Sequence, residues 1–196
     1  MIKIGIFGGT FNPPHLAHSV LSQKVKEILG LDKLIFIPSF LPPLKREEEV
    51  LEIRHRFVMA KIAFERNPGC EVSDIEINCS TEKSYTVDTL SVLHEIFKGP
   101  DVKFFLIIGI DNLIDFPKWK SPEKLFTLAD VVVINRPGCT FKNVKKEYAE
   151  KALFVELPLM DISSTMIRDY VKNGKPISHL VLPEIESYIN NNKLYK

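Results

Sequence analysis

The chain has 196 residues, of which 45% are hydrophobic and 26% are charged, a composition that argues against an intrinsically disordered protein. Lys and Arg number 26 against 25 Asp and Glu, so the formal net charge is +1 and lacks the basic excess typical of proteins that bind nucleic acid. We expect one domain over residues 1–196 with no membrane partner, because the apolar stretches are far shorter than the roughly 20 residues of a membrane span.

Short apolar segments that resemble strands alternate along the chain with segments of helical periodicity. The expected strands are 2–7, 34–37, 72–75, 102–108, 131–134 and 153–157. The expected helices are 16–29, 53–64, 87–97, 125–128, 164–172 and 183–191. Strands this apolar are typical of a parallel sheet with helices on both faces, so the predicted fold class is α/β with a doubly wound sheet. Ligands of such sheets bind beyond the carboxyl ends of the strands.

The chain starts with a strand-like segment, and no signal-peptide pattern precedes it. Cys70, Cys79 and Cys139 form no CxxC pair and are odd in number, which makes a disulfide framework or a zinc site a poor fit. We therefore expect a cytoplasmic protein whose cysteines are free thiols.

The first candidate site follows the first strand, in the string GGTFNPPHLAH that starts at Gly8 and ends at His18. Gly8 and Gly9 let a phosphate approach the backbone closely, because no Cβ stands in the way. His15 and His18 are three residues apart at a helix start, so their imidazoles are expected on one face beside free backbone N–H groups. The pattern predicts an anion receptor; a plain turn with two surface histidines, or a metal pair, is the alternative.

The second candidate site is the string ISSTMIR at 162–168. Ser163 or Ser164 can cap a helix whose first amides accept an anion. Arg168, one turn later, offers a forked cationic donor that suits phosphate. The alternative is a routine helix cap beside a solvated arginine.

Together these strings resemble the HxxH and ISSTxxR signatures of the nucleotidyltransferase superfamily, whose members have a Rossmann-like sheet. Three further segments resemble motifs of bacterial nicotinate-nucleotide adenylyltransferases, and the likeness spans the whole chain. They are KSYTVDTL at 83–90, Gly109-Ile110-Asp111 with Trp119-Lys120, and Asn135-Arg136-Pro137-Gly138.

The resemblance implies adenylyl transfer from ATP to nicotinate mononucleotide, which gives deamido-NAD and pyrophosphate for NAD biosynthesis. It implies His15, His18 and Arg168 as catalytic residues, with His18 at the α-phosphoryl group and more strongly protonated once triphosphate binds. Mg²⁺ is expected to be bound mainly through ATP, with no metal ligands from the protein. The expected ATP contacts are Gly8, Gly9, Thr10, Phe11, His15, His18, Gly109, Asp111, Asn135, Arg136, Ser163, Ser164, Thr165 and Arg168. The expected nicotinate mononucleotide contacts are Ser39, Lys45, Tyr85, Thr86 and Trp119.

The types of these residues agree with such roles. The flat ring of Trp119 can stack on a pyridine, although a core anchor is the alternative. Tyr85 and Thr86 offer hydroxyls and helix-start amides for a carboxylate. Asp111 can accept a hydrogen bond from a ribose hydroxyl, and Arg136 can lie against adenine or its phosphate.

The chain departs from the family pattern at three positions. Ala17 replaces a common glycine, Leu44 replaces a histidine, and Ser39 replaces an asparagine. Because the last two departures affect recognition of the pyridine side, a sibling transferase for nicotinamide mononucleotide or phosphopantetheine stays open. A module that binds nucleotide without turnover is a further alternative, and whether the protein forms a homo-oligomer is also open.

Overall fold

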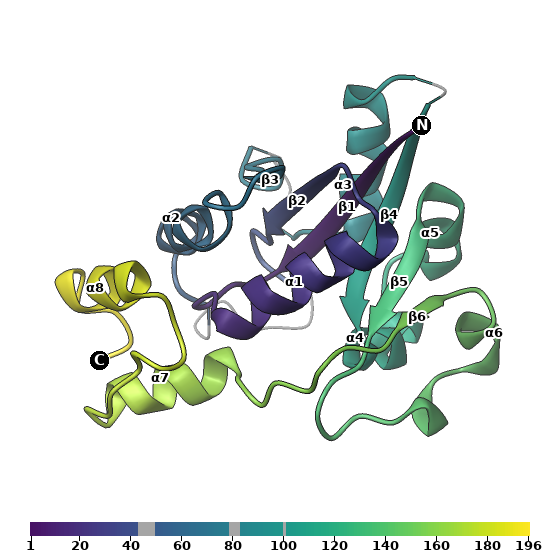
Figure 1. Ribbon diagram of the computed structural model, residues 1–196. Helices are drawn as coiled ribbons and strands as arrows, with labels where there is room; N and C mark the ends of the chain where they lie inside the picture. Colours follow the sequence, from purple (N-terminus) through teal and green to yellow (C-terminus); the bar gives the residue numbers. More distant parts are fainter. Residues whose placement is uncertain (43–49, 79–82, 100) are drawn as a thin grey trace.

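The computed structural model describes residues 1–42, 50–78, 83–99 and 101–196 (Figure 1). It contains a six-stranded sheet of order β3-β2-β1-β4-β5-β6, in which every neighbouring pair is parallel. The strands are β1 (Ile2–Gly9), β2 (Lys33–Pro38), β3 (Cys70–Val72), β4 (Val102–Gly109), β5 (Asp130–Ile134) and β6 (Leu153–Val155). The α-helices are α1 (Leu16–Leu29), α2 (Ile53–Phe64), α3 (Thr86–Ile96), α4 (Ile110–Asp115), α5 (Pro122–Leu128), α6 (Lys146–Ala149), α7 (Ser164–Lys172) and α8 (Pro183–Asn191). The described residues also form the short 3₁₀ helices η2 (Phe116–Lys118) and η3 (Phe141–Asn143).

The strand order places β1 and β4 side by side at the centre of the sheet. From β1 the chain winds outward through β2 to β3, and then returns to β4 and winds the other way. The connections therefore diverge between β1 and β4, the position at which doubly wound sheets leave a crevice for ligands. The carboxyl ends of these two strands are Gly9 and Gly109.

Alternate residues of each central strand point to opposite faces of the sheet, and each face carries its own hydrophobic core. In β2, Phe36 packs in one core and Ile35 in the other. Helices α1, α2, α7 and α8 bury residues in the first core, whereas α3, α4 and α5 bury residues in the second. In Figure 1, α1 lies in front of the sheet and α3 behind it. The predicted α/β class, with helices on both faces of a parallel sheet, is confirmed.

The predicted element bounds hold best where periodicity is long. Helices α1, α2, α7 and α8 begin and end where the sequence predicts. The strand expected at 72–75 is instead β3 at Cys70–Val72, and β6 stops at Val155 rather than 157. Helix α5 begins three residues early, at Pro122, because proline suits a first helical turn. Helices α4 and α6 were not predicted, since six and four residues are too short to show periodicity.

A search of the described residues finds no helix long and apolar enough to cross a membrane.

Candidate active site

The conformation of the loop from β1 to α1 depends on Phe11, a residue predicted from the sequence to contact ATP. Phe11 has a φ of 47° and is 2% exposed, with its ring packed edge-on against Phe7 and Phe64 in the core. A Cβ at Gly9 would lie 2.9 Å from this ring, whereas a Cβ at Gly8 would meet open space. Gly9 is thus required by the packing of Phe11, and Gly8 is the open position of the pair. The expected ATP contact of Phe11 is therefore limited to its backbone, because the side chain belongs to the core.

The two histidines of this loop lie on one face, as their spacing predicts. His15 is the N-cap of α1, and its backbone N–H donates to His18 Nδ1 at 3.2 Å. The imidazole rings stack with centroids 3.7 Å apart and planes at 24°. Because Nδ1 of His18 accepts a hydrogen bond, a neutral His18 carries its proton on Nε2. The ring therefore keeps one N–H donor for a ligand.

Both histidines are held neutral. Burial, together with the positive charge of Arg136, lowers the pKa of His15 from 6.5 to about 3. Burial also lowers the pKa of His18 well below its ordinary value, with contributions from His15 and Arg136. Among the described residues, nothing forms a hydrogen bond with the buried Nδ1 of His15. Two stacked imidazolium ions would also repel each other, so near neutral pH a bound anion is what favours a proton on one of the rings.

The start of α7 docks onto this loop across the sequence. Ser164 Oγ donates to the carbonyl of Pro13 at 2.8 Å, and Arg168 Nη1 donates to the carbonyl of Asn12 at 2.9 Å. Ser163 caps the helix, since its Oγ accepts from Met166 N–H at 3.2 Å. The two motifs are thus side by side, and Figure 1 shows α7 next to the start of α1. The Arg168 guanidinium is therefore bonded to this loop and not simply solvated, and it has further N–H donors for a ligand.

Thr165 and Tyr195 complete this docking. Arg168 Nη2 donates to Thr165 Oγ1 at 3.2 Å, which orients the guanidinium along the first turn of α7. Tyr195, near the end of the chain, donates its hydroxyl to Asn12 Oδ1 at 2.9 Å, and burial raises the pKa of Tyr195. The sequence analysis missed Tyr195, because a tyrosine in a C-terminal segment carries no local signal of such a contact.

A cavity of about 140 Å³ opens between the histidines, the end of β5 and the segment before α7. This volume is below the roughly 300 Å³ of a small-molecule pocket, so a nucleotide placed here extends beyond the cavity onto the surface. Its lining comprises Phe7, His15, Ala17, His18, Leu21, Ile134, Asn135, Arg136, Pro137, Met160, Asp161, Ile162 and Ser163.

The ends of β4 and β5 bring a further predicted pair together. Arg136 Nε lies 3.3 Å from Asp111 Oδ1, with each side chain 43% exposed. A Cβ at Gly109 would force both side-chain ends to shift, so the glycine leaves room for this pair. Asn135 has a different role, because its amide accepts from Leu157 N–H and donates to Leu157 C=O, both at 2.8 Å. The Asn135 side chain therefore extends the β5–β6 pairing and is not free for ATP.

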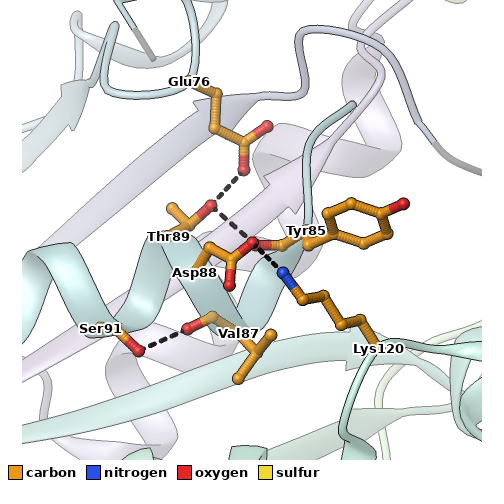
Figure 2. A network of polar contacts seen from close by, with 7 residues as sticks. All are labelled: Glu76, Tyr85, Val87, Asp88, Thr89, Ser91 and Lys120. Carbon is orange, nitrogen blue, oxygen red and sulfur yellow. Dashed lines mark hydrogen bonds and ion pairs between the residues drawn. The ribbon is translucent and has the colours of Figure 1, made fainter. Parts of the chain in front are cut away.

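A second group of predicted residues surrounds the start of α3. Tyr85 is the N-cap and Thr86 the first helical residue. Lys120 lies over the Tyr85 ring at 4.8 Å and forms an ion pair with Asp88 at 2.7 Å (Figure 2). The ring of Trp119 is partly buried and leans on Phe116 with centroids 4.8 Å apart. Trp119 thus has a core contact on one side while remaining partly exposed.

The segment after β2 connects the two groups. Ser39 N–H donates to the carbonyl of Gly9 at 2.9 Å, and Ser84 N–H donates to the carbonyl of Leu41 at 3.2 Å. Ser39 therefore lies between the β1–α1 loop and the chain that enters α3. The predicted contact Lys45 and the family departure Leu44 lie outside the described residues.

Two charged residues of the site, the buried Arg56 and the half-buried Glu76, were not predicted from the sequence. Arg56 of α2 is 1% exposed and donates to four backbone carbonyls, and burial lowers its pKa to about 10. Glu76 accepts from Thr89 Oγ1 at 2.7 Å (Figure 2), and burial raises its pKa. A signal existed for Arg56, because it lies one helical turn before Ala60 on the apolar face of α2. Glu76 precedes the predicted helix in an irregular segment and has no comparable signal.

Over the described ranges, no group of three or more His, Cys, Asp or Glu side chains is arranged to hold a metal ion. The carboxylate of Asp161 lines the same cavity as the histidine pair, and that of Asp111 pairs with Arg136. This donor set suits a metal ion carried by a nucleotide better than one caged by the protein.

The sequence and the structure were compared with known proteins. The model of the cytidylyltransferase-like family matches residues 6–170. The nicotinate-nucleotide adenylyltransferase of Bacillus subtilis is 37% identical over 196 residues, which cover 100% of both chains. A probable nicotinate-nucleotide adenylyltransferase of Halalkalibacterium halodurans is 38% identical over 197 residues, which cover 100% of this chain and 92% of that relative.

Solved structures show the same fold. The nicotinic acid mononucleotide adenylyltransferase of Plasmodium falciparum, in complex with NaAD, superposes with a TM-score of 0.82 at 21% identity, covering 100% of this chain and 98% of that one. A second structure of that enzyme, in complex with APC, gives a TM-score of 0.80 at 20% identity with the same coverage.

Proposed function

The chain belongs to the nicotinate-nucleotide adenylyltransferases of the cytidylyltransferase-like family, and we propose that it transfers the adenylyl group of ATP to nicotinate mononucleotide. The products are deamido-NAD and pyrophosphate. One observation carries the assignment to this site: the Arg168 guanidinium and the Ser164 hydroxyl bind the loop that presents His15 and His18. The proposal treats residues 1–196 as one catalytic domain, because this contact joins the two ends of the chain.

The reaction needs alignment more than activation. The 5′-phosphate of nicotinate mononucleotide attacks the α-phosphorus of ATP, and the bond to the departing pyrophosphate breaks. A phosphate monoester is already an anionic nucleophile, so the protein must bring two polyanions together and stabilise the charge that develops. Because His15 and His18 are neutral when the site is empty, the initial attraction falls to the positive charges of Arg136 and Arg168.

We assign His18 to the α-phosphoryl group, because its Nε2–H is the donor left after Nδ1 accepts from the backbone. A bound triphosphate raises the pKa of His18, since nearby negative charge favours imidazolium. Arg168 and the first amides of α7 hold the departing pyrophosphate. The ATP contacts proposed here are Gly8, Gly9, Thr10, the backbone of Phe11, His15, His18, Gly109, Asp111, Arg136, Ser163, Ser164, Thr165 and Arg168. In this set Asp111 accepts from a ribose hydroxyl, and Arg136 lies against the adenosine moiety.

Mg²⁺ enters the proposal as part of the nucleotide substrate. When bound to ATP it neutralises phosphate charge and polarises the α-phosphoryl group, and its ligands are mainly phosphate oxygens and water.

Nicotinate mononucleotide is placed at the start of α3. The backbone N–H groups at the start of α3, around Thr86, can donate to a carboxylate, and the adjacent Trp119 ring offers a surface for the pyridine. Ser39 lies beside Gly9 and is available to the ribose phosphate, with Tyr85 and Lys45 as the further contacts. The substrates are nucleotides of the cell interior, so the cytoplasmic location expected from the sequence is part of the proposal.

The test is a side-by-side assay of the purified protein with ATP and three acceptors: nicotinate mononucleotide, nicotinamide mononucleotide and phosphopantetheine. Pyrophosphate release and the dinucleotide product are measured for each acceptor. We expect the highest kcat/KM with nicotinate mononucleotide. Preference for another acceptor would replace the substrate, and binding of ATP with no pyrophosphate release from any acceptor would refute the transferase.

A further inference from the structure

The Arg56 guanidinium is buried in the protein among backbone carbonyls. Its Nη1 donates to the carbonyl of Thr10 at 2.9 Å and to that of Ser39 at 2.7 Å, and its Nη2 donates to that of Phe40 at 2.7 Å. Its Nε donates to the carbonyl of Leu51 at 2.7 Å. One side chain therefore fastens the β1–α1 loop to the segment that follows β2.

Glu76 holds the same segment from its other side. The backbone N–H of Phe40 donates to Glu76 Oε2 at 3.3 Å and to Ser84 Oγ at 2.9 Å. Phe40 is therefore fixed at its carbonyl by a buried cation and at its amide by a half-buried carboxylate. Arg56 and Glu76 act on one residue without forming an ion pair with each other.

From Glu76 the connection continues into α3. Thr89 Oγ1 donates to Glu76 Oε1 at 2.7 Å and lies 3.2 Å from the carbonyl of Tyr85, the N-cap of the helix (Figure 2). The first turn of α3 is thus tied to Glu76. A chain of hydrogen bonds runs from Thr10 through Arg56, Phe40, Glu76 and Thr89 to the helix start.

The energetic cost of burying the Arg56 guanidinium indicates that this residue has a role beyond stabilising the fold. Burial of a charge costs free energy that hydrogen bonds only partly return, and apolar side chains of similar size stabilise a core at least as well. The planar fork of arginine, however, can fix several carbonyls in one geometry, which an apolar side chain cannot do. A reaction between two bound substrates depends on such geometry, because a displacement of about 1 Å can lower the rate about a hundredfold.

We infer that Arg56 and Glu76 are positioning residues that set the start of α3, where nicotinate mononucleotide is proposed to bind, at a fixed distance from the Thr10 loop, where ATP is proposed to bind. This inference rests on the proposed function. It adds that neither residue needs to touch a substrate, and that their effect is on the alignment of the two substrates rather than on the affinity for either one.

The test compares Arg56→Lys, Glu76→Gln and the double variant with the parent. Lysine keeps the charge but loses the fork, and glutamine keeps the shape but turns one acceptor into a donor. Two matched controls use the same changes nearby. Arg54→Lys alters an arginine of α2 whose side chain is 72% exposed, and Glu65→Gln alters a carboxylate that accepts from Val72 N–H at 3.3 Å outside the site.

Three quantities are measured: kcat with both substrates saturating, the Kd of each substrate alone by calorimetry, and the folded fraction by near-ultraviolet circular dichroism. We expect kcat of each single variant to fall roughly tenfold to a hundredfold per folded molecule, with each separate Kd changed less than about threefold. The double variant should be no slower than about the slower single variant, because both changes release the same segment. The controls should keep the parent kcat.

The inference is overturned if kcat per folded molecule stays within about twofold of the parent, or if the loss appears in one substrate's Kd instead. If Arg56→Lys fails to fold, Glu76→Gln decides the matter by the same criteria. A failure of the proposed function is distinct, because the parent and both controls would then release no pyrophosphate with nicotinate mononucleotide.

Discussion

The neutral state of His15 predicts a specific dependence of stability on pH. The pKa of His15 is about 3 in the folded protein and near 6.5 in the unfolded chain. Below pH 6.5 the unfolded chain therefore binds a proton that the folded protein does not, so stability is complete above this pH and is lost as the pH falls toward 3. Between about pH 7.5 and about pH 5 this single group removes about 2 kcal/mol from the free energy of unfolding.

The measurement is urea unfolding of the parent and of His15→Asn at both pH values. Asparagine is a good N-cap residue without a titratable group, so the variant keeps the start of α1. We expect the parent to lose about 2 kcal/mol more than His15→Asn over this range. His18 contributes a loss of the same sign to both proteins, and a smaller one in the variant, because His15 is among the causes of the lowered pKa of His18. An equal pH dependence in the two proteins would refute a neutral, buried His15.

Three further predictions concern the same site. His18→Ala should lower kcat by roughly a hundredfold or more, with an unchanged circular dichroism spectrum, because it removes the donor proposed for the α-phosphoryl group; near-normal turnover would refute that role. An NMR titration of His18 should show its pKa rising when a non-hydrolysable ATP analogue binds, and no rise would remove the imidazolium from the mechanism. Asn135→Ala should lower the free energy of unfolding by roughly 1–3 kcal/mol in urea unfolding, because it leaves Leu157 N–H and C=O unpaired, and a larger effect on the Kd of ATP than on stability would restore Asn135 as a ligand residue.

The sequence predicted the features of the site that local geometry determines. The spacing of His15 and His18 places them on one helical turn, and the serines before α7 supply a cap wherever that helix packs. The meeting of these two segments was expected only from resemblance to a family. Their contact is made by the carbonyls of Asn12 and Pro13, and residue type carries no information about backbone carbonyls.

Contacts made by the backbone, or decided by distant packing, also explain what could not be predicted from the sequence. The hydrogen-bond partners of Arg56 are all main-chain carbonyls, so the sequence contains no complementary side chain from which the contact could be predicted. Phe11 stands within a ligand-binding motif, yet its positive φ turns the ring into the core, and the preference for that conformation depends on the packing around it. Asn135 also belongs to a motif, but its amide bonds to the backbone of Leu157, 22 residues later and just beyond β6.

The arginines and the histidines of the site differ in charge before a ligand binds. The positive groups that remain charged without a ligand, Arg136 and Arg168, are partly exposed or bonded to carbonyls, so they keep their charge at little cost. The buried histidines are neutral instead, because burial lowers the pKa of both rings and the charge of Arg136 lowers them as well. A triphosphate reverses this balance, since its negative charge favours protonation of the ring that it touches. On the proposed mechanism, full positive charge at His18 arises only when the reacting phosphate is present. The electrostatic stabilisation then acts on the bound substrate, and the empty site is spared the cost of a buried, unpaired charge.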